Sequence, residues 1–178
     1  YIPEFSNREI NSPGEPGVCY YMGAGFVSGG AAQEVKPILE NLANRLARRN
    51  KHIINLLNDY LEAVTIDYEA DVLPLTPGRN ATERHIVGAY VDAAKKGVSD
   101  LPEFWSEKLE RSREEVSQLI QDKAAFQNTI RKKLMKKGGI GYITPDPKTF
   151  PSVEEVNELT TACGALPCFA WLDGTSQG

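Results

Sequence analysis

The chain has 178 residues, of which 41% are hydrophobic and 25% are charged, a balance typical of a folded globular protein rather than a disordered one. No apolar run approaches the roughly 20 residues needed to cross a bilayer, so neither an integral membrane protein nor a membrane partner is expected. The net charge of −4 argues against a dedicated nucleic-acid binder.

Cysteine, histidine and the chain ends narrow the class further. Three cysteines at positions 19, 163 and 168 are sparse and lack zinc-knuckle spacing, which indicates a reducing compartment and predicts a cytoplasmic protein. Cys163 and Cys168 have no His or base nearby in the sequence, so we expect them to be buried, inert thiols. His52 and His85 are too few for a histidine-rich metal site within this chain alone. The chain begins without Met or a signal peptide and stops just after an apolar run, so we expect an internal fragment of a longer protein.

The first thirty residues predict strands. The apolar segment Val18–Val27 is rich in β-formers and is flanked by Pro16-Gly17 and Gly29-Gly30, which favours a buried strand. The segment Ile2–Asn11 could supply a short neighbouring strand.

The middle of the chain predicts helices. One apolar stripe runs from about Val35 to Glu62, and the segment 80–83 resembles a capping box that opens a helix ending near Lys96. A short helix is expected around 102–109, and a second box at 112–115 opens a long helix ending at Gly138-Gly139. We expect one shared core made by Leu42, Leu46, Ile53, Leu57, Val87, Leu119, Ile120 and Ile130.

The pattern then returns to strands. Ile140–Ile143 predicts a short strand, a third capping box at 152–155 opens a helix through Thr161, and Ala165–Leu172 predicts a buried strand. The order of strand, helical block, helix and strand predicts an α/β fold interrupted by a helical insertion. No strong catalytic motif is present: the chain has no phosphate-binding loop, dinucleotide fingerprint, HExxH or nucleophile elbow.

Several short segments nevertheless resemble, in order and spacing, the PHP (polymerase and histidinol phosphatase) family. Arg8-Glu9-Ile10-Asn11-Ser12 is similar to the segment in which a strand ends in a metal-binding Glu. Cys19–Gly25 keeps the family's glycine turn but lacks the His before it, and Glu83–Val87 approximates an Arg-x-His-Ile element that opens a helix. Ala162–Ala165 followed by Phe169–Leu172 resembles the family's helix, Ala-Gly-Gly and apolar strand, with Trp171 where a ligand His is expected.

The resemblance implies a fold and a site. The fold would be a fragment of a distorted βα barrel with a large, mostly helical insertion. The whole chain, 1–178, would then be a single PHP-like domain fragment, with barrel strands in 1–30, the insertion in 31–150, and a barrel helix and strand in 151–178. Glu9 would be a metal ligand, with Asp173 as a substitute oxygen ligand, and Arg84 and His85 would face the substrate. Glu9 and Trp171 would lie near the same end of the sheet, because barrel sites gather at the carboxyl ends of strands.

The implied activity is metal-dependent hydrolysis of a phosphoester, with Mn or Zn in the parent protein and a phosphorylated small molecule as substrate. The alternative is a decayed PHP-like fold that acts as a binding or scaffold module through its helices. With two imidazoles missing, we expect this fragment to hold no metal tightly and to be inactive alone. The oligomeric state stays open.

Each candidate residue also has a plainer interpretation. Glu9 could be a surface carboxylate, Arg84 a solvated arginine, and His85 a packed or hydrogen-bonded histidine. His52 lies in a long amphipathic segment and is interpreted as structural. The basic run at 131–137 complements the negative end of a helix dipole, so nucleic-acid contact is not needed to explain it.

Overall fold

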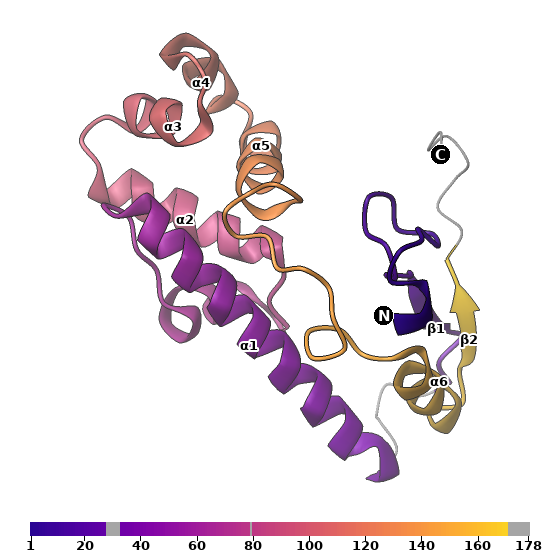
Figure 1. Cartoon of the computed structure of the whole chain (residues 1–178). Helices are drawn as coiled ribbons and strands as arrows, with labels where there is room; N and C mark the ends of the chain where they lie inside the picture. Colours follow the sequence, from indigo (N-terminus) through magenta and orange to yellow (C-terminus); the bar gives the residue numbers. More distant parts are fainter. Residues whose placement is uncertain (28–32, 79, 171–178) are drawn as a thin grey trace. The chain divides into compact units, whose positions relative to one another are not determined.

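The computed structural model describes residues 1–27, 33–78 and 80–170. They form an α/β protein that is dominated by helices (Figure 1). The chain divides into two compact units, which we call the terminal unit (residues 1–46 and 144–178) and the helical unit (residues 47–143). The helical unit lies within the range 31–150 that was expected to form an insertion. None of the helices in the described ranges is long and apolar enough to cross a membrane.

The terminal unit contains a two-stranded sheet covered by a helix. Its elements are η1 (Pro3–Phe5), β1 (Tyr21–Ala24), η2 (Gln33–Val35), the first part of α1 (Lys36–Leu61), α6 (Val153–Ala162) and β2 (Leu166–Phe169). The strands β1 and β2 pair antiparallel, with Tyr21 opposite Phe169 and Ala24 opposite Leu166. Neighbouring strands of a βα barrel are parallel, so the described sheet is not a section of a regular barrel.

Helix α6 packs against both strands and covers one face of the sheet. The face is identified by Gly23, where an added Cβ would lie 2.9 Å from the Thr160 methyl group on α6. Side chains alternate between faces along a strand, so Met22 and Ala24 point to the opposite face. On that face Met22 is 48% exposed and Leu166 is 71% exposed. One side of the sheet is therefore an open apolar surface in the described part of the chain.

Three strand predictions need correction. Ile2–Asn11 is not a strand, because Pro3 begins the 3-10 turn η1 and the segment continues through hydrogen-bonded turns that close with the Ile2 N–H donating to the Gly17 carbonyl at 2.8 Å. Val18–Val27 shortens to β1, since Gly25 has a left-handed φ of +70° that ends the strand. The strand expected in Ala165–Leu172 forms at Leu166–Phe169, and neither strand is buried as expected.

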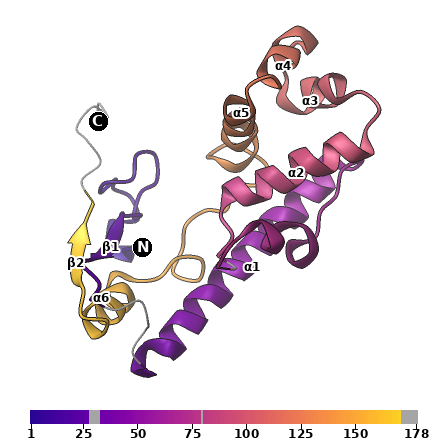
Figure 2. The same ribbon diagram turned by 180° about the vertical axis from the view of Figure 1, so that it is seen from behind.

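The helical unit packs the second part of α1 with four further helices around one core (Figure 2). Its other elements are the π-helical turn η3 (Tyr68–Val72), η4 (Leu73–Leu75), α2 (Glu83–Gly97), α3 (Leu101–Leu109), α4 (Arg113–Leu119) and α5 (Lys123–Met135). Of the expected core residues, Ile53, Leu57, Val87 and Ile130 are buried in it, and Leu119 and Ile120 pack against it half-buried. Leu42 and Leu46 are half-buried outside this core.

Aromatic side chains hold the centre of the helical unit. Trp105 of α3 is fully buried and meets Phe126 of α5 edge to face, with ring centroids 5.7 Å apart. Tyr90 of α2 is also buried, and its hydroxyl donates to the Ile54 carbonyl at 3.0 Å and to Asn58 at 2.7 Å. Burial raises the pKa of the Tyr90 hydroxyl, which keeps it a neutral donor. These contacts join α1 to α2 and α3 to α5.

Capping residues explain where the helices begin. The boxes at Ser112 and Ser152 form as expected, each serine accepting from the backbone N–H three residues on. Helix α2 begins slightly later than expected, because its N-cap is Thr82 and not Asn80. The long helix expected from 112 to 138 is two helices, since Asp122 caps a new one by accepting from the Ala124 N–H at 2.9 Å and a second N–H at 3.0 Å.

The strand expected at Ile140–Ile143 is also absent. This segment instead closes the end of α5, with the Gly141 N–H donating to the Leu134 carbonyl at 2.7 Å. Gly139 lies so close to the helix end that an added Cβ would be 2.5 Å from the Leu134 carbonyl carbon. The two glycines are therefore needed for close backbone approach to the last turn of α5.

Candidate functional site

Glu9 lies in an exposed loop of the terminal unit. The loop is tied down by backbone hydrogen bonds on both sides, with the Arg8 N–H donating to the Phe5 carbonyl at 2.8 Å and the Gly17 N–H donating to the Arg8 carbonyl at 2.9 Å. Ser12 is buried and donates to Glu15 at 2.8 Å. These contacts give the backbone around Glu9 a defined path, while its carboxylate stays in solvent.

Asn11 connects the Glu9 loop to the end of the sheet. Its side-chain amide donates to the Ala170 carbonyl at 2.7 Å and to the Tyr20 carbonyl at 3.1 Å, and its oxygen accepts from the Tyr20 N–H at 2.7 Å. Tyr20 precedes β1 and Ala170 follows β2, so one side chain joins both strands at the same end. Trp171 follows Ala170 in the sequence and Asp173 is two residues further on, and both lie outside the described residues. Glu9 is thus held near the point where the chain continues towards Asp173.

Arg84 and His85 lie side by side in the first turn of α2, in the helical unit. His85 Nδ1 accepts a hydrogen bond from the Thr82 N–H at 3.0 Å and lies 3.0 Å from the Thr82 hydroxyl. The imidazole is therefore part of the helix cap, in the position that a Glu or Gln usually takes. Arg84 is exposed, and its Nη1 donates to the neutral side chain of Asn128 on α5 at 3.2 Å.

Glu83, the first residue of α2, binds three cations. Its Oε2 accepts from Arg131 Nε and from Lys136 Nζ, each at 2.8 Å, and its Oε1 lies 3.4 Å from Arg49 Nη2. The Glu83 side chain is only 12% exposed. Burial alone would raise its pKa, but hydrogen bonds from Lys136 and Arg131 outweigh burial and lower the pKa below its ordinary value. We call these four residues the Glu83 cluster; it joins α1, α2 and the end of α5.

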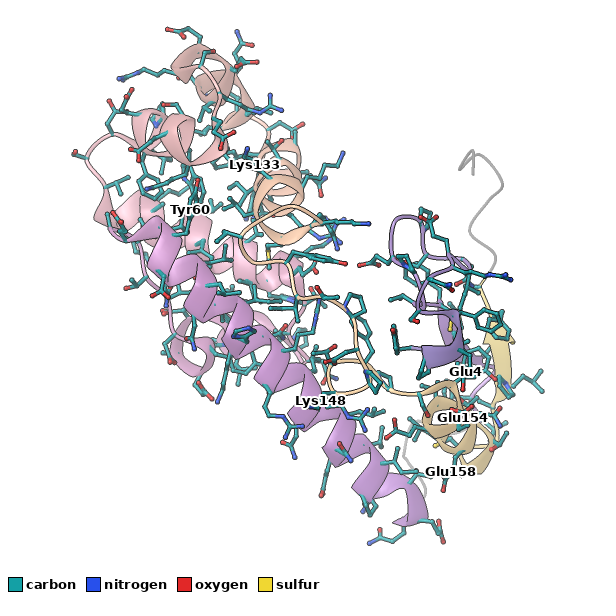
Figure 3. The ribbon with its side chains drawn as sticks, viewed as in Figure 1. Glu4, Tyr60, Lys133, Lys148, Glu154 and Glu158 are labelled. Atoms are coloured by element: carbon teal, nitrogen blue, oxygen red, sulfur yellow. The ribbon has the colours of Figure 1, made fainter. Side chains whose placement is uncertain are left out.

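The Glu83 cluster is not predicted from the sequence, where Glu83 belongs to a capping box and the run 131–137 complements a helix dipole. In the structure, Arg131 and Lys136 contact Glu83. Lys133, which is labelled in Figure 3, instead donates to Glu110 at the end of α3 at 2.6 Å. Lys132 and Lys133 also line a cleft of about 650 Å³ together with Leu109, Glu110, Arg111, Glu115 and Thr129. The cations of the run 131–137 are visible in the sequence, but their carboxylate partner, Glu83, lies on another helix and could not be predicted from their spacing.

Metal-ligating groups do not gather in the described ranges, where no set of three or more His, Cys, Asp or Glu side chains could hold an ion together. In the terminal unit, burial raises the pKa of the Cys19 thiol, which keeps it protonated and a poor metal ligand. Glu9 is the described member of the expected ligand pair, since Asp173 falls outside the description.

Comparison with family models, with curated proteins and with solved structures finds no match to this chain.

Proposed function

We propose that this chain is part of a PHP-like, metal-dependent phosphoesterase, with Glu9 as one oxygen ligand of a divalent ion and Asp173 as a second. The observation that carries the proposal is the bridge made by Asn11, two residues after Glu9, to the carbonyl of Ala170. It fixes the candidate ligand loop at the end of the sheet, beside the segment that leads to Asp173. The bound Mn or Zn would supply an activated water, and the chain's own part is to position carboxylates around it.

The open face of the sheet supports a larger β-structure around this pair. A two-stranded sheet is marginally stable in water, and an apolar face gains stability only when another layer covers it. Met22 and Leu166 are exposed on the face that α6 leaves free. We assign that face to the interior of a distorted βα barrel, in which the antiparallel pair is the distorted part and the helical unit is the insertion.

The proposed substrate is a phosphorylated small molecule in a cytoplasmic setting. Arg84 is the candidate donor to its phosphate, because its exposed guanidinium binds a neutral amide and no carboxylate among the described residues, which keeps its charge available. His85 plays a positioning role in this proposal, since its Nδ1 is engaged in the helix cap.

A titration with Mn²⁺, monitored by amide resonances, tests the metal site even when binding is weak. The proposal predicts selective paramagnetic broadening of residues 8–12 and of the segment after Ala170, and its loss in Glu9→Gln and in Asp173→Asn. Glu4→Gln is the matched control, because Glu4 is an exposed carboxylate in the same terminal unit (Figure 3). Broadening that is unchanged in Glu9→Gln, or lost equally in Glu4→Gln, contradicts the proposal.

The second candidate is a decayed PHP-like fold that acts as a binding or scaffold module. Cys19 and Trp171 stand where the family resemblance expects imidazoles, and in the first part of α1 the apolar Leu39 is exposed. Both candidates predict that the isolated chain retains no metal after dialysis and does not hydrolyse 4-nitrophenyl phosphate with added Mn²⁺ or Zn²⁺, because two carboxylates leave an ion mostly hydrated. One equivalent of retained metal with turnover abolished by Glu9→Ala contradicts this expectation for both.

A further inference from the structure

The charge of the chain is divided unequally between its two units. Residues 47–143 carry sixteen Lys and Arg against fourteen Asp and Glu, whereas the remaining residues carry four against ten. The terminal unit therefore has a formal charge of −6 and the helical unit one of +2, so the net charge of −4 does not describe the surface of the helical unit. A local site for an anion is compatible with this distribution.

Positive charge gathers at the Glu83 cluster. Arg131 and Lys136 both contact the Glu83 carboxylate there, which leaves a formal surplus of one positive charge among these three side chains. Arg84 adds another cation in the same turn of α2. It reaches Asn128, one helical turn before Arg131 on α5, so the two guanidinium groups lie on adjacent turns of the same seam between α2 and α5.

Most donors of these two arginines remain available. Arg131 uses Nε for Glu83, and its two terminal nitrogens bind no other group in the described ranges. Arg84 uses one nitrogen for an amide oxygen and has no carboxylate partner among the described residues. A planar guanidinium presents paired N–H groups that match the oxygens of a phosphate, so the two side chains together offer a set of charge-assisted donors.

Glu83 gives this site its geometry. Its carboxylate is mostly buried and ionised, with hydrogen bonds from Lys136 and Arg131 that fix where both cations lie. Without that anchor, long cationic side chains would lose more conformational entropy on binding a ligand. The carboxylate therefore prepositions an excess of cations that it does not neutralise.

We propose that the Glu83 cluster, with Arg84 beside it, is a phosphate-binding site of the helical unit, contacted chiefly by Arg84, Arg131 and Lys136. The inference relies on the proposed function only for the role of Arg84; Arg131 and Lys136 have no part in the metal site. The shared chemistry is a phosphate group, which can belong to a small molecule or to the backbone of a single-stranded nucleic acid.

Two probes separate these sources: inorganic pyrophosphate and a labelled thymidine octanucleotide, each titrated into the full chain at low salt without metal. Binding of pyrophosphate alone assigns the site to small phosphates. Tighter binding of the octanucleotide, with a log K that falls linearly with log salt, assigns it to a nucleic-acid backbone. Either result supports the proposal. If neither pyrophosphate nor the octanucleotide binds, the proposal is wrong.

Two variants locate the binding. Arg84→Ala removes an exposed cation, and Arg131→Lys keeps a charge for Glu83 but removes the two free terminal nitrogens; each should weaken binding by about tenfold. Lys95→Ala is the matched control, since Lys95 is an exposed cation in the last turn of the same helix. A loss in Lys95→Ala equal to that in Arg84→Ala overturns the assignment, as does full binding by both cluster variants.

The same titration distinguishes this proposal from the metal site. Glu9→Gln should leave phosphate binding unchanged, because no residue of the cluster belongs to the terminal unit. If Mn²⁺ fails to broaden the Glu9 loop while the cluster variants lose phosphate binding, the proposed activity fails and this inference stands. If Mn²⁺ broadens the Glu9 loop but the cluster variants bind phosphate fully, the metal site is supported and the phosphate site is wrong.

Discussion

Leu57→Ala probes the packing of the helical unit at a fully buried position of its core. Leu57 is 1% exposed and contacts the segment that closes α5, where its side chain lies 3.2 Å from the position of a Cβ on Gly141. Replacing Leu with Ala in a core costs roughly 2–5 kcal/mol, with larger values where the surroundings cannot collapse into the cavity. Because Leu57 is held in a helix and faced by a turn fixed through Gly141, we expect a loss of about 3–5 kcal/mol in unfolding free energy.

Urea unfolding followed by tryptophan fluorescence measures this loss. Trp105 is fully buried in the helical unit, so a Trp171→Phe background makes the signal report on that unit alone. Leu75→Ala is the control, since Leu75 is 43% exposed in the same unit and should cost less than about 1 kcal/mol. A loss below about half a kcal/mol for Leu57→Ala, or equal losses for both variants, would refute the packing described for the core.

Three further predictions concern single contacts. The lowered pKa of Glu83 stabilises the fold above the ordinary value of 4.5, and this contribution is lost as pH falls through the lower folded-state pKa. Glu83→Gln should therefore lower the free energy of unfolding at neutral pH and make that free energy depend less on pH in the acid range. An equal effect of Glu114→Gln, a carboxylate outside the Glu83 cluster, would contradict the role of the cluster. Asp122→Ala should cost about 0.5–2 kcal/mol by removing the cap of α5, measured by thermal unfolding, and no change would mean that α4 and α5 are one helix. Gly139→Ala should destabilise by several degrees in Tm because its Cβ meets the helix end, whereas Gly97→Ala, with open space at its Cβ, should not.

The positions of the helices follow largely from local sequence signals. The apolar period of α1 predicts its position almost to the residue, and the boxes at Ser112 and Ser152 mark the starts of α4 and α6. These signals depend on residues within one or two turns, so no tertiary information is needed to interpret them. The break before α5 was missed because apolar residues continue through Leu119 and Ile120, and only the hydrogen bonds of Asp122 show that a new helix begins.

The contacts that define the candidate sites come from distant segments. Glu83 and Arg131 are 48 residues apart, and Asn11 and Ala170 are 159 residues apart. A charge pattern on one helix indicates that cations are present, but the carboxylate that gathers them lies on another helix. In the same way, Asn11 carries no motif of its own beyond its place after Glu9. The sequence therefore shows which residue types are present on each helix and loop, whereas the contacts between distant segments are seen only in the structure.

The position of Glu9 relative to the end of β2 is the central claim, and one distance tests it most directly. Asn11 donates to the Ala170 carbonyl. Glu9 is two residues before Asn11 and Trp171 is one residue after Ala170, so the length of the chain limits the Cα separation of Glu9 and Trp171 to roughly 20 Å. A nitroxide label on Glu9→Cys, with the three native cysteines replaced by serine, would broaden the Trp171 indole resonance if the two positions are this close. We predict strong broadening that is lost when the label is reduced; an indole resonance unaffected by the label would contradict the placement of Glu9 beside the proposed metal site.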